Sequence, residues 1–526
     1  MNNNQKGFLT WFTMGFAVIW AVLIGLDYGN KHPGYYFSFS YFRYTVLYLV
    51  ISIIGIGSYF LKPKLTSNIK WLQLRGIHLF GFICILFFII IFANRNYGET
   101  PSTFSHLFSF WSRSIFNLSM LLIFFSIMRS LGQLIGARLL SEYIFQSFII
   151  DTAIGTMIFT LLLFFVGAAN LLSVTTVLLL LFISVIANVT FFVSSVKGYL
   201  LDPINIDRVN FMGWASFIFV LFFLSLNYLS TNIPYPAGFD SRNVYVNISK
   251  LIASSGGLAE GFQPYNWSLL MSVGFIMFDY VELALGLSFS AIVLSVIGVK
   301  ELSTKVLKID INKTLFITAL FVVTPALVNQ MFIEIKADFG MLFVQLASLL
   351  VFFKWISEND TQAGDHYKLL VLLGMLCGYG MGIKLINMFL VFVLIALIWW
   401  NENNKYSLAG ILLISVAILI FAGIDDLSGL QAYHKSINLT SMLCGVSGIG
   451  LIVFGFIKHK VSSIKNITYS MIMGVSILVA FSPWIGKNFI ESKSLNPKTL
   501  ILGKGSGPDI GNFNTINRNY RNSKKK

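Results

Sequence analysis

Long apolar runs alternate with short polar segments along most of the chain, and this pattern predicts a series of membrane-spanning helices. Runs of roughly 18 to 22 apolar residues match the thickness of a lipid bilayer. We place spans near residues 8–27, 42–61, 78–95, 113–130, 148–168, 173–194, 211–229, 280–299, 314–332, 339–356, 367–382, 385–400, 407–423, 439–457 and 467–485. Residues 266–279 are apolar but too short to cross, so they predict a helix lying in the membrane interface. The predicted fold class is an all-α, polytopic transmembrane helical bundle.

The polar interruption at residues 232–266 is the longest water-compatible segment before the C-terminal tail. It carries Asp240, Arg242 and Lys250 soon after a predicted membrane exit. Segments that only connect two spans are usually shorter than this one. Its length and charges favour a functional site at the membrane surface, and an ordinary solvated loop is the alternative.

The composition agrees with a membrane protein and changes how the charge is interpreted. Of 526 residues, 56% are hydrophobic and only 11% are charged, with a mean hydropathy of +0.77 and a net charge of +15. In a polytopic membrane protein such a basic excess sits mainly in cytoplasmic loops and sets the topology, so it does not indicate a nucleic-acid partner. The three cysteines, Cys84, Cys377 and Cys444, fall inside apolar runs and predict neither disulfides nor a metal cluster.

Clusters of basic residues predict the orientation. The segments 62–75, 300–313 and 458–465 are rich in lysine and should be cytoplasmic, which also puts the N-terminus in the cytoplasm. The loop with Asp240 and the turn at residues 334–338 should then lie outside. We expect a multi-pass protein of the plasma (inner) membrane whose first apolar run is a retained span, not a cleaved signal.

The basic C-terminal tail does not fit this alternation. Counting spans places residues 491–526 outside, where lysine is unfavoured. Either one span is miscounted or a further membrane segment follows in longer relatives.

Ionisable residues gather at the predicted outer ends of the spans. They are Asp240 and Arg242, the group Glu334, Lys336 and Asp338, and Asp279, Lys384 and Lys487. Carboxylates there could activate a nucleophile or hold a divalent cation, and the cations could bind phosphate. For each residue alone, a side chain reaching from the interface to water is the simpler interpretation. No zinc-protease, Walker or serine-hydrolase motif is present in the sequence.

The order of these elements resembles the GT-C glycosyltransferases, integral-membrane enzymes that use polyprenyl-phosphate-linked sugars. The segments that carry the resemblance are GFDSRNVYVNISKLIASSGGL, PYNWSLLMSVGFIMFDYVELALGLSFSAIVLSVIGV, EIKADFGMLF, GMGIKLINMFL and FSPWIGKNFI. The resemblance implies a catalytic core at residues 198–490 with an outer loop at 231–279 that contains interfacial helices. Residues 1–197 would be accessory spans and 491–526 a polar tail.

The resemblance also implies roles for individual residues. Asp240 would be the catalytic base, and Glu334 or Asp338 would complete the active site or bind metal. We expect Arg242, Lys336, Lys384, Lys487 and Asp279 to contact substrate. Many relatives carry a second acid at this position, and Asp240 has none beside it, which argues against a metal-dependent mechanism. A divalent cation stays an alternative, and no cofactor is firmly implied.

The implied reaction is an inverting sugar transfer on the non-cytoplasmic side of the membrane. Its partners would be a polyprenyl-phosphate-linked sugar, an acceptor glycan, lipid or protein, and membrane lipids. Two other interpretations stay open. A transporter or flippase of a lipid-linked or anionic solute would show buried mid-span charge or repeated broken helices, and a non-catalytic scaffold would keep the fold alone.

Overall fold

The computed structural model describes residues 75–93, 103–139, 147–201, 209–232, 244–332, 336–357, 363–401, 405–421 and 434–503, and these are helical with short connections. The helices are α3 (Gly76–Ala93), α4 (Phe104–Leu139), α5 (Phe148–Ala168), α6 (Val174–Ile186), α7 (Val189–Leu201), α8 (Phe211–Thr231), α9 (Val246–Ser255), α10 (Asn266–Phe278), α11 (Val281–Glu301), α12 (Ile311–Val322), α13 (Pro325–Phe332), α14 (Asp338–Ser357), α15 (Ala363–Ile383), α16 (Met388–Asn401), α17 (Lys405–Phe421), α18 (His434–Lys458), α19 (Lys460–Ser492) and α20 (Pro497–Leu502). A π-helical turn, Leu302–Val306, follows α11, and a 3₁₀ turn, Leu385–Asn387, follows α15.

Among these residues, 8 helices are long and apolar enough to cross a membrane, or up to 9 if the bent pair α6–α7 is one span. The prediction of an all-α polytopic bundle is thereby confirmed. The spans expected at 8–27 and 42–61 lie outside the described residues. Helices α3, α16 and α17 form where spans were predicted, but their apolar parts are shorter than 18 residues.

Two predicted spans are broken in the structure. The span expected at 173–194 is two helices, α6 and α7, that meet at an angle of 84°. The span expected at 314–332 stops at Val322 and restarts as α13 at Pro325. Proline lacks an amide hydrogen and disfavours helix in the preceding residue, so Pro325 accounts for the second break.

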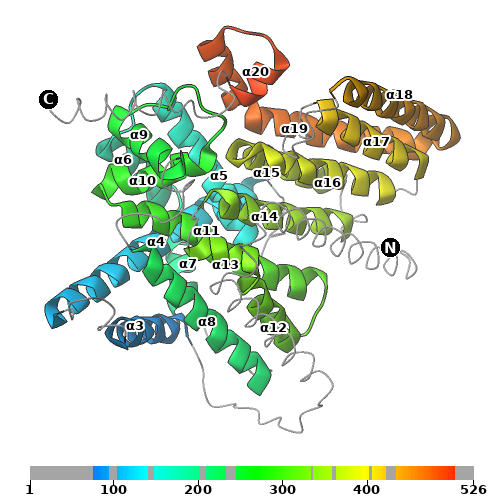
Figure 1. Ribbon diagram of the computed structural model, residues 1–526. Helices are drawn as coiled ribbons and strands as arrows, with labels where there is room; N and C mark the ends of the chain where they lie inside the picture. The colour runs from blue at the N-terminus through cyan, green and yellow to red at the C-terminus, as the bar shows by residue number, and fades with distance from the viewer. Residues whose placement is uncertain are drawn as a thin grey trace.

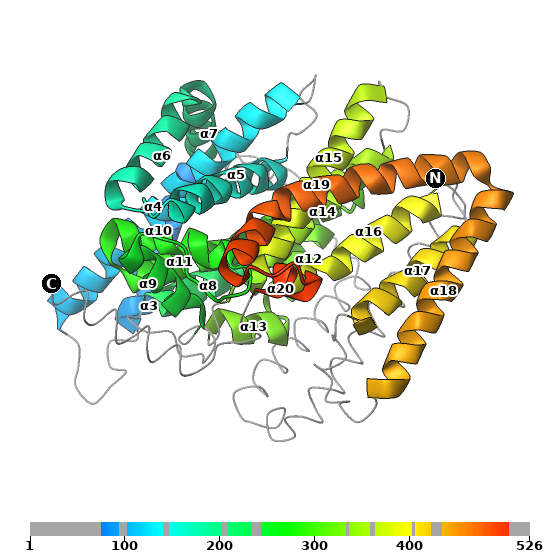
Figure 2. The ribbon, with the colours of Figure 1, turned by 90° about the horizontal axis from the view of Figure 1, so that it is seen from above.

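The helices pack as a central group with a layer on either side. In Figure 1, α5, α11 and α14 lie in the middle, with α3, α4 and α8 below them. Helices α16 to α19 lie to the other side in both views (Figure 2). Helix α10 is also central: Asn266 to Ile276 are all buried, and a Cβ on Gly340 of α14 would lie 2.2 Å from Trp267. The short apolar helix expected in the membrane interface is therefore enclosed by protein.

Contacts along the central helices define two ends of the bundle. Helices α11 and α14 run in parallel, because Ser288 bonds the Lys336 carbonyl while Gly298 faces Leu346. Asp338, which begins α14, forms an ion pair with the residue that follows α15. The starts of α11 and α14 and the end of α15 therefore share one end, which we call the site end.

Helix α19 runs in the same direction as α15. Gly374 of α15 faces Met473, and two turns later Gly382 faces Trp484. The hairpin between α18 and α19 therefore lies at the end of the bundle opposite the site end. The basic segments 300–313 and 458–465 share this opposite end, which agrees with the predicted alternation of charge.

The accessory helices pack tightly among themselves and against the core. A Cβ on Gly132 of α4 would lie 1.8 Å from the Asp151 carbonyl, and one on Gly155 of α5 would lie 1.7 Å from the Met128 carbonyl. Only glycine permits this approach of α4 to α5. Helix α5 in turn packs against α14, α11, α15 and α10, so the accessory block is joined to the predicted core along a whole span.

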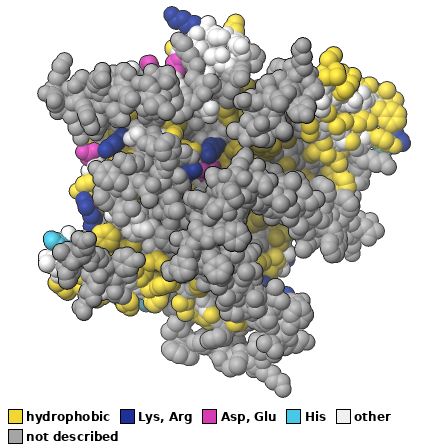
Figure 3. All heavy atoms as spheres, in the orientation of Figure 1, with side chains coloured by type: hydrophobic (Ala, Val, Ile, Leu, Met, Phe, Trp, Pro, Cys, Tyr) yellow, Lys and Arg dark blue, Asp and Glu magenta, His cyan; other side chains and the backbone are white. Residues whose placement is uncertain are grey.

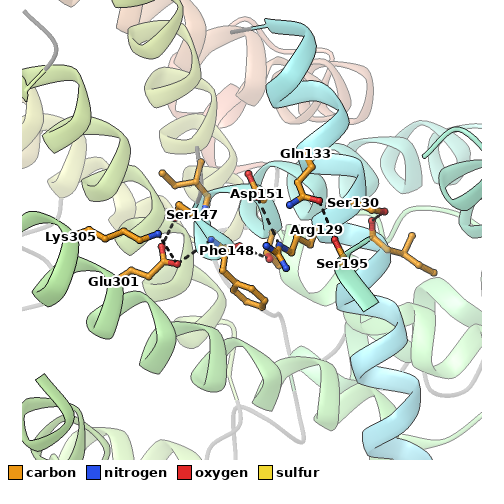
Figure 4. A network of polar contacts seen from close by, with 12 residues as sticks. Arg129, Ser130, Gln133, Ser147, Phe148, Asp151, Ser195, Glu301 and Lys305 are labelled. Atoms are coloured by element: carbon orange, nitrogen blue, oxygen red, sulfur yellow. Dashed lines mark hydrogen bonds and ion pairs between the residues drawn. The ribbon is translucent and has the colours of Figure 1, made fainter. Parts of the chain in front are cut away.

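A buried polar cluster ties the two blocks together at the opposite end (Figure 4). Glu301 of α11 accepts hydrogen bonds from the Ser147 hydroxyl and the Phe148 amide, the latter at 3.1 Å, at the start of α5. Lys305 lies 3.2 Å from the same carboxylate. Glu301 thus satisfies one of the amide groups that a helix N-terminus leaves without partners. One turn further along α5, Asp151 lies 3.9 Å from Arg129 of α4.

Candidate functional site

An ion pair at the site end joins two of the residues that the sequence singles out. The Lys384 Nζ lies 2.7 Å from the Asp338 Oδ1, and both side chains are partly buried. Asp338 is the first residue of α14, where a negative charge is favoured by the helix dipole. Lys384 is an extended residue between α15 and the following 3₁₀ turn. A charge-assisted hydrogen bond of this length fixes the lysine head.

Backbone bonds hold both residues in place. The Ser288 hydroxyl of α11 donates to the Lys336 carbonyl at 3.0 Å, which fixes the entry to α14. The Lys384 amide donates to the Gly380 carbonyl, and the Lys384 carbonyl accepts from the Asn387 amide, both at 3.0 Å. The lysine is therefore held between two consecutive turns, not on a mobile connection.

An amide network supports the turn from behind. The Asn266 Nδ2 donates to the Tyr379 carbonyl at 3.1 Å, and the Trp484 indole donates to the Asn266 Oδ1 at 2.9 Å. A Cβ on Gly382 would lie 2.2 Å from the Asn266 Nδ2, so only glycine fits there. Asn266 thereby connects α10, α15 and α19 just beneath Lys384.

A second amide fixes the same turn from the side of α14. The Asn387 Nδ2 donates to the Cys377 carbonyl, and the Gln345 Nε2 donates to the Asn387 Oδ1, both at 3.0 Å. Gly380 leaves room for this amide, because a Cβ there would lie 2.4 Å from the Asn387 Nδ2. The glycines of the predicted Gly-Lys turn therefore serve close packing.

Tyr245 brings the outer loop to the ion pair. It stands just before α9, and the Lys384 Nζ lies 5.8 Å from its ring centroid. Burial raises the pKa of the Tyr245 phenol, so it is neutral at physiological pH. Burial alone would lower the pKa of Lys384, but Tyr245 and Asp338 together raise it above its ordinary value. The site therefore keeps a cation and a neutral hydroxyl side by side.

The remaining predicted residues lie in different surroundings. Lys487 is buried in α19, where it forms an ion pair with Glu491 at 2.6 Å, and its Nζ lies 5.7 Å from the Tyr265 ring centroid. The helix α19 extends to Ser492, so Lys487 is helical and not in an emerging loop. Asp279 is exposed and ends α10 in a left-handed conformation.

A second ion pair lies beyond Asp279. Arg113 of α4 lies 3.5 Å from Glu282 and stacks on the Tyr280 ring at 4.8 Å. Glu282 is buried, so this pair links α4 to the start of α11. Arg113 therefore has a structural role, because its contacts join two helices.

The structure thus pairs Asp338 with Lys384 and places Lys336 two residues before Asp338. Asp240, Arg242 and Glu334 lie outside the described residues. Sequence reasoning missed Tyr245 and the two asparagines, because a tyrosine or an amide in an apolar chain carries no motif. The one available signal is the position of Asn266 and Asn387 beside the loop and the Gly-Lys turn.

The described residues do not support a metal centre. Among them, no group of three or more His, Cys, Asp or Glu side chains could hold a metal ion. Asp338 has a lysine as its close partner, which is the wrong charge for a cation ligand set. Lys384 and the neutral Tyr245 phenol can both donate hydrogen bonds to an anion, while Asp338 offsets the charge of the lysine.

Comparison with known proteins adds no further constraint. No family model, curated protein or solved structure matches this chain.

Proposed function

We propose that the protein is a membrane glycosyltransferase that takes a sugar from a polyprenyl-phosphate donor on the non-cytoplasmic side. The observation that supports this proposal most is the ion pair between Asp338 and Lys384, with Tyr245 beside it. Three elements contribute to it: the start of α14, the turn after α15, and the loop before α9. A lipid donor with its tail in the bilayer would present its phosphate at the height of these helix ends.

In the proposed reaction, an acceptor hydroxyl oxygen bonds to the anomeric carbon of the sugar. The bond from that carbon to the phosphate oxygen breaks, and the lipid phosphate leaves with the bonding electron pair, which inverts the anomeric centre. The hydroxyl proton passes to a carboxylate, for which we propose Asp240. Lys384 and Lys336 would stabilise the charge that develops on the leaving phosphate.

The neighbours of Lys384 favour this role over simple anchoring. A lysine that only reaches for water needs no fixed partner. Here Asp338, Tyr245 and two backbone bonds hold the side chain and its turn. Such preorganised cations cost little reorganisation when charge develops in the transition state.

Donor consumption in membranes with matched expression tests the proposal. Radiolabelled polyprenyl-phosphate sugars are supplied, and the released lipid phosphate is measured. We expect Lys384→Gln to lower consumption strongly, while Lys493→Gln, an exposed lysine at the end of α19, leaves it near wild type. Equal activity in the two variants, or no consumption of any donor by wild type, would contradict the proposal.

The base has its own test. Asp240→Asn should lower the transfer rate on the order of 100-fold to 10,000-fold, as loss of a general base does. Glu260→Gln is the matched control, because Glu260 is an exposed acid in the same outer segment. Full activity of Asp240→Asn would move the role of base to Glu334 or Asp338.

Two observations favour the second candidate, a transporter or flippase. Helices α6 and α7 meet at 84°, and broken helices are a feature of transporters. Asp151 is buried and pairs with the partly exposed Arg129, and ion pathways use buried charges of this kind. Movement of a fluorescent polyprenyl-phosphate lipid across proteoliposomes, without loss of its sugar, would favour this candidate over the enzyme.

A further inference from the structure

An apolar stripe runs along α18 and reaches the hairpin that joins α18 to α19. Its side chains recur every three or four residues and are all more than half exposed: Leu439, Met442, Leu443, Val446, Ile449, Val453 and Ile457. In Figure 3, apolar side chains gather over the region of α17 and α18. A one-sided apolar stripe on an outlying helix of a membrane protein is the face expected to contact lipid.

The stripe has the length of a bilayer. From Leu439 to Ile457 it covers about 27 Å at 1.5 Å per residue, close to the ~30 Å of a hydrocarbon core. The residues that follow Ile457 should therefore lie at the level of the lipid headgroups.

These residues form what we call the basic hairpin, residues 457–465. Ile457 and Val461 are 75% and 83% exposed, among the most exposed large apolar side chains that the structure describes. Between them stand Lys458, His459 and Lys460, all exposed. Segment 455–469 contains no aspartate or glutamate. Apolar tips beside a basic cluster without local acids are complementary to an anionic membrane surface.

A neighbouring turn at the same end shows the difference. Residues 300–313 also expose lysines, including Lys300 and Lys308. That turn includes Glu301 and Asp310 within the same segment and so has a smaller net positive charge per residue. The basic hairpin lacks such acids, and its two apolar side chains are more exposed than Leu307 of that turn, which is 57% exposed.

We propose that the basic hairpin is a docking site for the headgroups of anionic phospholipids. Ile457 and Val461 would enter the acyl boundary, and Lys458 and Lys460 would contact the headgroup phosphates. Lys458 is already oriented by Tyr406, whose hydroxyl lies 3.1 Å from its Nζ. Each lysine near an anionic membrane surface strengthens binding to that surface. The proposal is independent of the proposed sugar transfer.

The test uses the purified full chain in an uncharged detergent. Short-chain phosphatidylglycerol and phosphatidylcholine of the same chain length are titrated, and native mass spectrometry gives the Kd of the first bound lipid. We expect wild type to prefer phosphatidylglycerol, and Lys458→Gln with Lys460→Gln to weaken its binding about tenfold or more, consistent with two lysines. The matched control, Lys300→Gln with Lys308→Gln, removes the same charge and should change this Kd less than about twofold.

Three outcomes would overturn the proposal. One is equal affinity of wild type for the two lipids, which would instead favour a protein partner at the hairpin. Another is an unchanged phosphatidylglycerol Kd in the Lys458 and Lys460 double variant. The third is an equal loss in both double variants, which would show a response to net charge alone. Ile457→Ser with Val461→Ser should weaken the binding of both lipids alike. An unchanged Kd in this variant would contradict the proposed insertion of these two side chains into the lipid.

Discussion

Lys384 should remain charged throughout the physiological pH range. Its folded-state pKa is raised from the ordinary 10.5 by Tyr245 and Asp338, although burial opposes this. For a raised lysine pKa, the stabilising charge is fully present below the unfolded pKa and is lost as pH rises through the folded one. We therefore predict a donor Kd that is constant from about pH 6 to 9. A wild-type donor affinity that falls between pH 6 and 9, while that of Lys384→Gln stays constant, would contradict a permanently charged Lys384.

At this scale the sequence predicted the charges but not their partners. Asp338 and Lys384 were both singled out, since charge at a span end is conspicuous. Their pairing depends on α14 and α15 lying side by side, which no local pattern encodes. Lys487 is equally conspicuous in the sequence, yet it forms an ion pair with Glu491, one turn away on the same helix.

Glu301 acts at the scale of helices, because it caps α5 from α11. Its removal leaves the Ser147 hydroxyl and the Phe148 amide without their acceptor in a buried position. We predict that Glu301→Ala lowers the free energy of unfolding by about 1–3 kcal/mol. Glu260→Ala, at an exposed position, should change it by less than about 0.5 kcal/mol. Unfolding by sodium dodecyl sulfate, followed by circular dichroism, gives both values, and equal stability of the two variants would contradict the capping role.

The sequence predicts the ends of a helix correctly where the apolar run and the helix have the same length. The span predicted at 148–168 coincides with α5, and α14 and α18 begin and end close to their predictions. Pro325 is a local sign of the break before α13, but the continuous apolar run around it predicts an unbroken span. The bend between α6 and α7 has no proline or glycine at residues 186–189, so the sequence offers no local sign of it.

At the scale of the whole molecule, the accessory helices had no role that the sequence could assign. The structure shows α5 inside the bundle, where the Thr160 and Tyr379 hydroxyls lie 3.0 Å apart. At the site end, the Leu172 amide donates to the Gly256 carbonyl at 2.9 Å, so the turn after α5 supports the outer loop. Contacts between residues so far apart in the chain leave no pattern in hydropathy or charge. The accessory block is therefore part of the scaffold of the candidate site.

The two ends of the bundle should face opposite sides of the membrane. Val461 stands at the hairpin and Leu495 just beyond α19, and they are 83% and 78% exposed. The native cysteines lie within apolar helices, so wild type serves as the unlabelled control for an impermeant maleimide. We predict that Leu495→Cys is labelled from the non-cytoplasmic side and Val461→Cys only after the membrane is opened, because the lysines beside Val461 favour the cytoplasm. Labelling of both from one side would contradict the architecture. Labelling with the sides exchanged would keep the architecture and place the candidate site in the cytoplasm, which would exclude the proposed outer-face transfer.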